Sequence, residues 1–170
     1  MRIAPLLIAR PLLVAAALLL AAAAPPTRSA GVPVPLQPQP GTPLDAIARG
    51  LAAQDLAAAR RGGQQPLLLV GSARLGAASD RAAVFVQLQS PRECGSAGCS
   101  TSVYAWIKGA WKKVLDGASG RLAVAPARTR GMADLLAGDE RYVWTGAEYQ
   151  DSRPAPAVDL RPRSPRRPGH

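Results

Sequence analysis

The stretch that most constrains the fold is residues 84–115, where two apolar segments flank a short loop with a cysteine at each end. In the first segment, Val84, Val86 and Leu88 alternate with Phe85 and two glutamines, which is the period of a β-strand. The second segment, residues 103–107, alternates in the same way. The sequence therefore predicts two antiparallel strands joined by a loop that a disulfide can close.

The N-terminus has the features of a secretory leader. Arg2 and Arg10 flank the start of an apolar run at residues 12–24. This run is too short to cross a bilayer core of about 30 Å, which requires roughly 20 apolar residues. Small residues at its end suit cleavage after Ala23. We expect residues 1–23 to be a signal peptide, with an uncleaved anchor as the alternative. The mature protein would then be periplasmic or secreted, without stable membrane insertion.

Cys94 and Cys99 form an even pair in a chain that we expect to be exported, so a disulfide is the expected state. Two glycines between them permit tight closure of the loop. A redox centre is the alternative, although thiol–disulfide oxidoreductases place two residues between their cysteines and this chain places four. Two cysteines and one histidine cannot complete a structural zinc site. We expect no metal and no cofactor.

Composition divides the rest of the chain into regions. Residues 24–42 are rich in proline, whose fixed φ and missing N–H predict a polyproline-like linker outside helix and sheet. Residues 150–170 contain five arginines, many prolines and few apolar side chains, which predicts a disordered basic tail. The sequence between them, residues 43–149, is long enough for one small domain.

The domain is predicted to begin with an amphipathic helix over residues 43–61. Thr42 suits the N-cap, Pro43 suits the first helical position, and Gly62 follows the last turn. The apolar stripe of this helix consists of Leu44, Ile47, Leu51, Ala52 and Leu56. We expect this one helix to pack on a small antiparallel β-sheet, a meander of hairpins between residues 66 and 149. The predicted fold class is therefore α+β.

One turn of this meander makes a specific prediction about register. Gly109 and Ala110 are expected to be the central residues of a tight turn, with glycine in the first position. Lys113 would then lie opposite Trp106, close enough for a cation–π contact worth about 0.5–1 kcal/mol.

The aromatic side chains have two interpretations. In a domain this rich in alanine they can fill the core, and if exposed they would form a patch that binds sugar or protein. The sequence alone leaves both interpretations open. Together with one carboxylate, the candidate binding surface consists of Tyr104, Trp106, Trp111, Asp134 and Trp144.

Catalytic chemistry has few candidates in this chain. His170 ends the predicted tail, so no serine has a histidine base nearby, and no glycine-rich loop matches a phosphate-binding pattern. A carboxylate-dependent hydrolase would require Asp134 to cluster with Glu140 or Glu148 in an aromatic-lined cleft. The alternative is that Asp134 stabilises a turn. We therefore name no catalytic residue.

Five segments occur in a fixed order along the domain: FVQL at residues 85–88, CGSAGC at 94–99, WKKVL at 111–115, GMADL at 131–135 and WTGAEY at 144–149. In this order they resemble a group of small exported proteins of Gram-negative bacteria that carry a CGSxGC disulfide loop and are of unknown function. The resemblance favours a periplasmic location. It implies no activity, substrate or catalytic residue.

These observations favour a non-catalytic binding or interaction domain of the cell envelope. The alternatives are a carboxylate-dependent cell-wall hydrolase and a thiol redox protein. The formal net charge of +10 permits an anionic partner. The expected partners are an envelope protein, such as a hydrolase that the domain inhibits, or the anionic cell wall, contacted by the arginines between residues 161 and 167. Nucleic acid is not expected for an exported chain without a binding motif.

Overall fold

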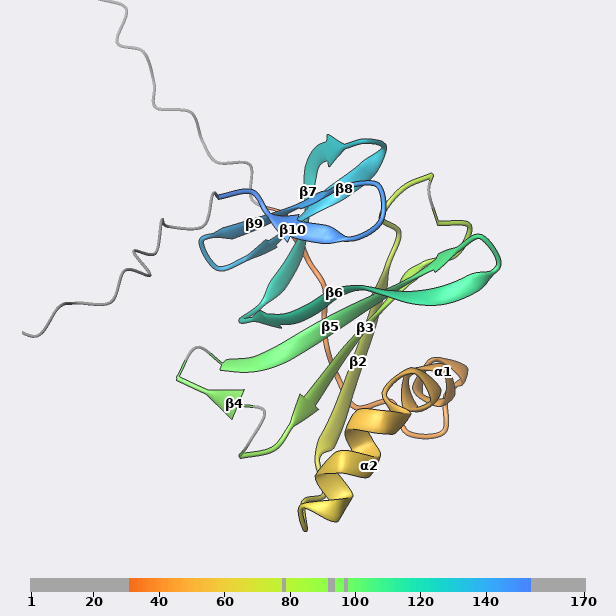
Figure 1. Ribbon diagram of the computed structural model, residues 1–170, viewed down its shortest axis with the longest axis vertical. Helices are drawn as coiled ribbons and strands as arrows, with labels where there is room; N and C mark the ends of the chain where they lie inside the picture. Colours follow the sequence, from red (N-terminus) through yellow and green to blue (C-terminus); the bar gives the residue numbers. More distant parts are fainter. Residues whose placement is uncertain (1–30, 78, 92–93, 97, 154–170) are drawn as a thin grey trace, which may run out of the picture.

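The structure is a computed structural model that describes residues 31–77, 79–91, 94–96 and 98–153. The predicted leader, the first part of the predicted linker (residues 24–30) and the predicted tail from residue 154 onward lie outside the described residues. Two antiparallel sheets and two helices are stacked in layers, with both helices on the same side of one sheet (Figure 1). An arrangement of antiparallel sheets with the helices gathered on one face agrees with the predicted α+β class.

The strands form two sheets. Sheet A contains, in spatial order, β1 (Val32–Pro33), β7 (Leu122–Thr129), β8 (Met132–Ala137), β9 (Glu140–Trp144) and β10 (Tyr149–Asp151). Sheet B contains β2 (Leu67–Ala73), β3 (Ala83–Gln89), β5 (Gly98–Ile107), β6 (Ala110–Ser119) and the short β4 (Cys94–Gly95). From β5 to β10 consecutive strands run antiparallel as predicted, but among the described residues β6 pairs only with β5 and β7 only with β1 and β8, so the predicted single sheet is two sheets.

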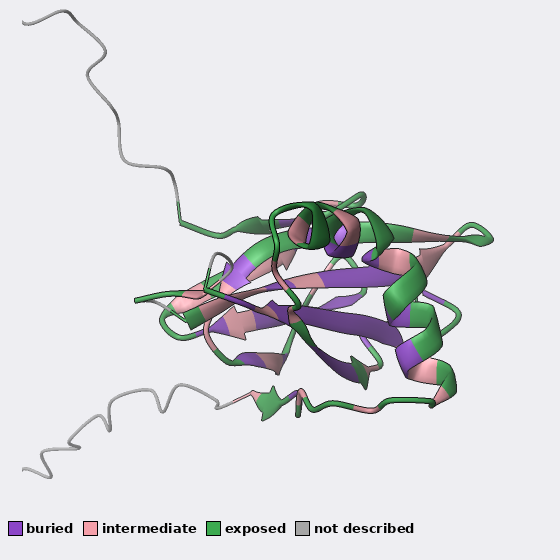
Figure 2. Cartoon of the chain, turned by 90° about the horizontal axis from the view of Figure 1, so that it is seen from below, coloured by how far each residue is buried: buried purple, intermediate pink, exposed green. Residues whose placement is uncertain are grey.

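Strand β3 is buried on both of its faces. Val84 and Val86 pack in the core that sheet B shares with the helices, whereas Phe85 packs in the core between the two sheets. This arrangement explains why β3 is apolar over most of its length, whereas a strand with one wet face alternates with polar residues. Figure 2 shows the central strands buried along most of their length and the outer faces of the helices exposed.

The predicted single helix is two helices, α1 (Pro43–Leu51) and α2 (Ala53–Arg61). The N-cap prediction is confirmed, because Thr42 Oγ1 accepts a hydrogen bond from the Asp45 N–H at 3.1 Å. The break falls at Ala52, whose φ of −92° and ψ of 14° leave the helical region. The nearby Gly50 lowers the helix propensity of this turn. Figure 1 shows the two helices running in different directions over sheet B.

Part of the predicted linker belongs to the sheets, which corrects the prediction for residues 32–37. Val32 and Pro33 pair with β7, the Val34 N–H donates to Leu122 O, and Gln37 exchanges two hydrogen bonds with Val70 on the edge of β2. Proline cannot donate to a ladder, but it is tolerated at sheet edges, where the residues between prolines still donate. Gly71 permits the close approach, because a Cβ there would lie 2.6 Å from Pro35 O.

The two ends of the meander also differ from the prediction. The β5–β6 turn consists of Lys108 and Gly109, both with positive φ, so Trp106 pairs with Trp111 instead of Lys113. Two central residues with positive φ match the twist of a tight hairpin. At the other end, Gln150 and Asp151 continue strand β10, so the first residues of the predicted tail lie in sheet A.

The predicted disulfide is present. Cys94 on β4 and Cys99 on β5 are directly opposite one another, with their Cα atoms 3.9 Å apart. The loop is also joined to the neighbouring strand, because Gln87 Nε2 donates to Cys99 O at 3.2 Å. The bridge therefore holds a small hairpin extension against the end of sheet B.

Replacing both cysteines with serine is expected to lower the free energy of unfolding by about 2 kcal/mol, because the bridge closes a short loop in the unfolded chain. Urea unfolding of the double variant and of the oxidised protein measures this difference. The fold itself is expected to persist, since the two cores do not include the loop. A variant that no longer unfolds cooperatively would contradict this local role.

Candidate functional site

A cleft of about 440 Å³ lies between α2 and the face of sheet B that the helices partly cover. Alanines on the helix leave this space open, because they carry no long side chain toward the sheet. The strands contribute both apolar and polar groups. The lining residues are Ala52, Asp55, Ala58, Ala59, Gln64, Val86, Leu88, Ser100, Ser102, Tyr104, Lys113, Asp116 and Gly117.

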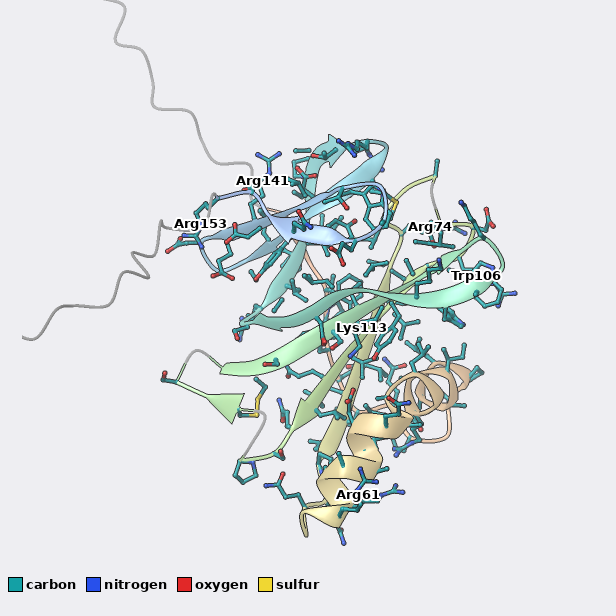
Figure 3. The ribbon with its side chains drawn as sticks, viewed as in Figure 1. Arg61, Arg74, Trp106, Lys113, Arg141 and Arg153 are labelled. Atoms are coloured by element: carbon teal, nitrogen blue, oxygen red, sulfur yellow. A yellow bond between two sulfur atoms is a disulfide. The ribbon has the colours of Figure 1, made fainter. Side chains whose placement is uncertain are left out.

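Lys113 is the centre of the polar groups in this cleft. Its Nζ lies 3.2 Å from Asp116 Oδ1 on the same strand and 3.8 Å from Asp55 Oδ2 on α2. Asp116 Oδ1 also accepts a hydrogen bond from Ser102 Oγ at 2.8 Å. Figure 3 shows Lys113 on sheet B, facing the helices. One ammonium and two carboxylates thus lie together in the cleft, with an excess of one negative charge.

The protonation of these groups follows from their contacts. Burial alone would raise the pKa of Asp116, but hydrogen bonds from Ser102 and Lys113 and the lysine charge outweigh burial and lower the pKa. Burial alone would lower the pKa of Lys113, but its hydrogen bond to Asp116 and the neighbouring negative charges raise the pKa. Asp116 is therefore an anion and Lys113 a cation at neutral pH. Neither is poised to exchange a proton, as a general acid or base must be.

Tyr104 is the one residue of the predicted binding surface that lines the cleft. Its ring is buried, and its hydroxyl donates to Leu51 O at the end of α1 over 3.4 Å. Lys113 Nζ lies 5.8 Å from the ring centroid. The prediction of Trp106 as the cation–π partner of Lys113 is therefore wrong: the partner is Tyr104, because the turn is displaced by one residue. Burial raises the pKa of Tyr104, and the positive charge of Lys113 only partly offsets this effect.

Trp106 and Trp111 lie apart from the cleft, at the end of the β5–β6 hairpin. Their ring centroids are 5.4 Å apart and their planes meet at 77°, an edge-to-face contact. Arg81 lies over the Trp106 ring, with Cζ 4.3 Å from the centroid. Both tryptophans are partly exposed, and Trp111 also packs against the core under the helices.

Asp134 on β8 and Trp144 on β9 are both buried side chains of sheet A. Trp144 is 3% exposed in the core between the sheets, where it contacts Tyr149 edge to face at 5.3 Å. Asp134 is fully buried on β8 and is paired with the guanidinium of Arg141 on β9, whose Nε lies 2.9 Å from Asp134 Oδ2. Within the described residues, Asp134 Oδ1 has no hydrogen-bond partner. These two residues are inaccessible to a ligand.

The carboxylates proposed for a hydrolase have separate partners. Glu140 accepts a hydrogen bond from the Tyr142 hydroxyl at 2.6 Å and pairs with Arg153, and Glu148 accepts one from Gln150. Asp134 is occupied by Arg141. The structure therefore gives each of these carboxylates a partner of its own and does not join them in a cleft.

Sequence reasoning missed Asp55, Ser102 and Asp116 as site residues. Strand pairing joins Ser102 on β5 to Asp116 on β6, and only the packing of α2 on sheet B adds Asp55 to them. The sequence does contain one signal of the site: Ser100, Ser102 and Tyr104 occupy alternate positions of one strand, which places three hydroxyl groups on the same face.

Among the described residues, no group of His, Cys, Asp and Glu could hold a metal ion. In the same part of the chain, no helix is long and apolar enough to span a membrane.

Replacing Arg141 with alanine is expected to destabilise the protein by about 3 kcal/mol, because the buried Asp134 carboxylate would lose the one ion pair that it makes among the described residues. In the background of Asp134→Asn the same replacement is expected to cost much less. Chemical unfolding of the two single variants and the double variant measures the coupling. Equal costs of Arg141→Ala in both backgrounds would contradict the pairing.

The three tyrosines are expected to resist ionisation in the folded protein. Burial raises the pKa of each, and with the hydrogen bond to Glu140 it raises the pKa of Tyr142 to about 12. The unfolded chain therefore ionises first, near pH 10, so the stability that the neutral phenols contribute is complete below that pH and is lost as the pH rises toward 12. Alkaline titration followed by phenolate absorbance checks this. A tyrosine that ionises near pH 10 before unfolding would contradict it.

Known proteins give no family for this chain: comparisons with protein-family models, with curated proteins and with solved structures found no match.

Proposed function

We propose that this protein is an exported, non-catalytic binding domain of the cell envelope, and that the cleft between α2 and sheet B is its ligand site. The observation that carries the proposal is the group of Lys113, Asp55 and Asp116 in an open cleft that is lined by both polar and apolar groups. Fixed charges of both signs beside apolar surface are the features by which proteins orient small polar ligands.

The charges define the class of ligand. A ligand with an amino group can donate to the two carboxylates, and a ligand carboxylate can accept from Lys113. Val86, Leu88 and the helix alanines supply apolar contacts for its carbon skeleton. Peptides of the cell wall carry both amino and carboxylate groups, and a volume of about 440 Å³ is suited to a short peptide fragment. We therefore propose the peptide portion of peptidoglycan as the ligand.

The proposed compartment rests on two features of the chain. The N-terminal sequence has the charge pattern and length of a secretory leader. The Cys94–Cys99 bridge supports an oxidising environment, since such bridges persist in exported proteins and are rare in the cytosol. A periplasmic location would place the domain beside the wall.

Protonation favours binding over hydrolysis. Hydrolysis by two carboxylates needs one that is protonated near neutral pH, and this requires a raised pKa. The pKa of Asp116 is lowered, and that of Lys113 is raised. These groups keep fixed charges, which suits them to holding a ligand.

The replacement Lys113→Met is expected to weaken binding to purified peptidoglycan by about tenfold, the loss of one charge-assisted hydrogen bond. Co-sedimentation of residues 24–170 with peptidoglycan at low and moderate salt measures the affinity. The matched control is Arg121→Met, which removes one charge from an exposed turn outside the cleft. Both variants keep the basic tail, so its contribution is the same in each.

The result is decisive in either direction. Binding that survives moderate salt and weakens only in Lys113→Met supports recognition by the cleft. Equal weakening in both variants, or complete release by salt, would mean that the wall attracts the protein by net charge alone. Absence of binding by the unaltered protein would refute the wall ligand.

A further inference from the structure

We infer that the end of the β5–β6 hairpin docks on an anionic lipid surface. This hairpin end consists of Trp106, Lys108, Trp111 and Lys112, together with Arg81, which stacks on Trp106. The inference goes beyond the proposed function and rests on residues that do not line the cleft. Figure 3 shows Trp106 at the far end of the hairpin, whereas Lys113 lies nearer the middle of sheet B.

The hairpin end has a fixed shape. Two residues, Lys108 and Gly109, make the turn, and the cross-strand pair of Trp106 with Trp111 is the second pair after it, behind Ile107 and Ala110. The edge-to-face contact of the two rings and the Arg81 guanidinium, 4.3 Å from the Trp106 centroid, hold the aromatic groups in place. Aromatic surface is therefore presented without the entropy cost of ordering a flexible loop on binding.

The hairpin end carries positively charged side chains that are exposed to solvent. Lys108, Lys112 and Arg81 are exposed, and none of them takes part in an ion pair among the described residues. Lys113, on the other face of the same strand, is by contrast held by two carboxylates. The acidic neighbour is Asp80, which precedes Arg81 and is also exposed. Three free cations against one carboxylate leave the hairpin end attractive to anions.

This combination of groups matches the interface of an anionic membrane. Tryptophan rings favour the headgroup level of a bilayer, because the ring is apolar and its N–H needs a polar partner. Lysine and arginine beside them are attracted to phosphate groups of anionic lipids. A neutral sugar or neutral protein surface would use the aromatic surface but would leave the three cations without a counter-charge. The cations therefore favour an anionic partner, and the partly exposed tryptophan pair favours a lipid surface as the occupant.

The test measures binding to vesicles of phosphatidylcholine alone and of phosphatidylcholine mixed with phosphatidylglycerol in equal parts. The protein is residues 24–170, because the apolar run of the leader would itself bind lipid. Co-sedimentation gives the affinity, and the tryptophan emission maximum reports whether the rings enter the lipid. Trp144 contributes a constant background, since it is already buried. We expect binding and a blue shift only with the anionic vesicles.

Two charge reversals identify the docking surface. Lys108→Glu with Lys112→Glu is expected to weaken binding by about tenfold or more and to abolish the blue shift. The matched control, Arg60→Glu with Arg61→Glu, makes the same change of net charge on exposed residues at the end of α2 and is expected to retain the blue shift. Circular dichroism confirms that both variants are folded.

Three results would overturn the inference. The first is no binding of the unaltered protein to anionic vesicles. The second is equal weakening in the two variants, which would mean attraction by net charge. The third is the same blue shift with soluble polyphosphate, which would mean that the hairpin end recognises polyanions and not a lipid surface. None of these results bears on peptidoglycan binding by the cleft, so the two proposals fail separately.

Discussion

The burial of β3 on both faces is the constraint on which the rest of the structure depends. A strand that is apolar on one face needs one covering layer, but a strand with Val84 and Val86 on one face and Phe85 on the other needs two. The helices supply one cover and sheet A the other. The meander must therefore leave sheet B after β6 and continue as a second sheet, and the helices must pack on the remaining face.

The candidate site results from the difference between the two layers that cover sheet B, which are sheet A on one face and the helices on the other. Sheet A covers its face of sheet B with large side chains, among them Leu135 and Trp144. The helices are short and rich in alanine, so they leave part of the other face open. On that open part the strand residues become polar, and Lys113 lies between carboxylates from a helix and from its own strand. A thin layer on one side of a doubly covered sheet thus produces a cleft with charged walls.

The sequence predicts most of the strands, the helix N-cap and the disulfide, because these depend on neighbours along the chain. Alternation marks β3, the Thr42–Pro43 pair marks the start of α1, and the two cysteines face each other across a short loop.

The predictions are wrong where the structure of a segment depends on residues that are distant in the sequence. The proline-rich sequence near residue 33 predicts a linker, because the neighbouring residues in the sequence do not indicate that β7 and β2 lie beside it. The hairpin register depends on whether lysine or glycine takes the first turn position, and the positive φ of Lys108 is a small local cost that the flanking strands overcome. Asp55 and Asp116 belong to one site only through packing.

The segment at residues 31–37 covers strand edges that would otherwise be open to another molecule. It pairs with β7 at Val32 and then with β2 at Gln37, so one short piece of chain occupies exposed edges of both sheets. Its prolines offer no N–H outward, and so they do not extend either ladder to a second molecule. A chain shortened to begin at α1 would lose Val34 from the core between the sheets and would expose two unpaired strand edges. The pairing of this segment with β7 and β2 therefore covers two strand edges to which a second molecule could otherwise add a strand.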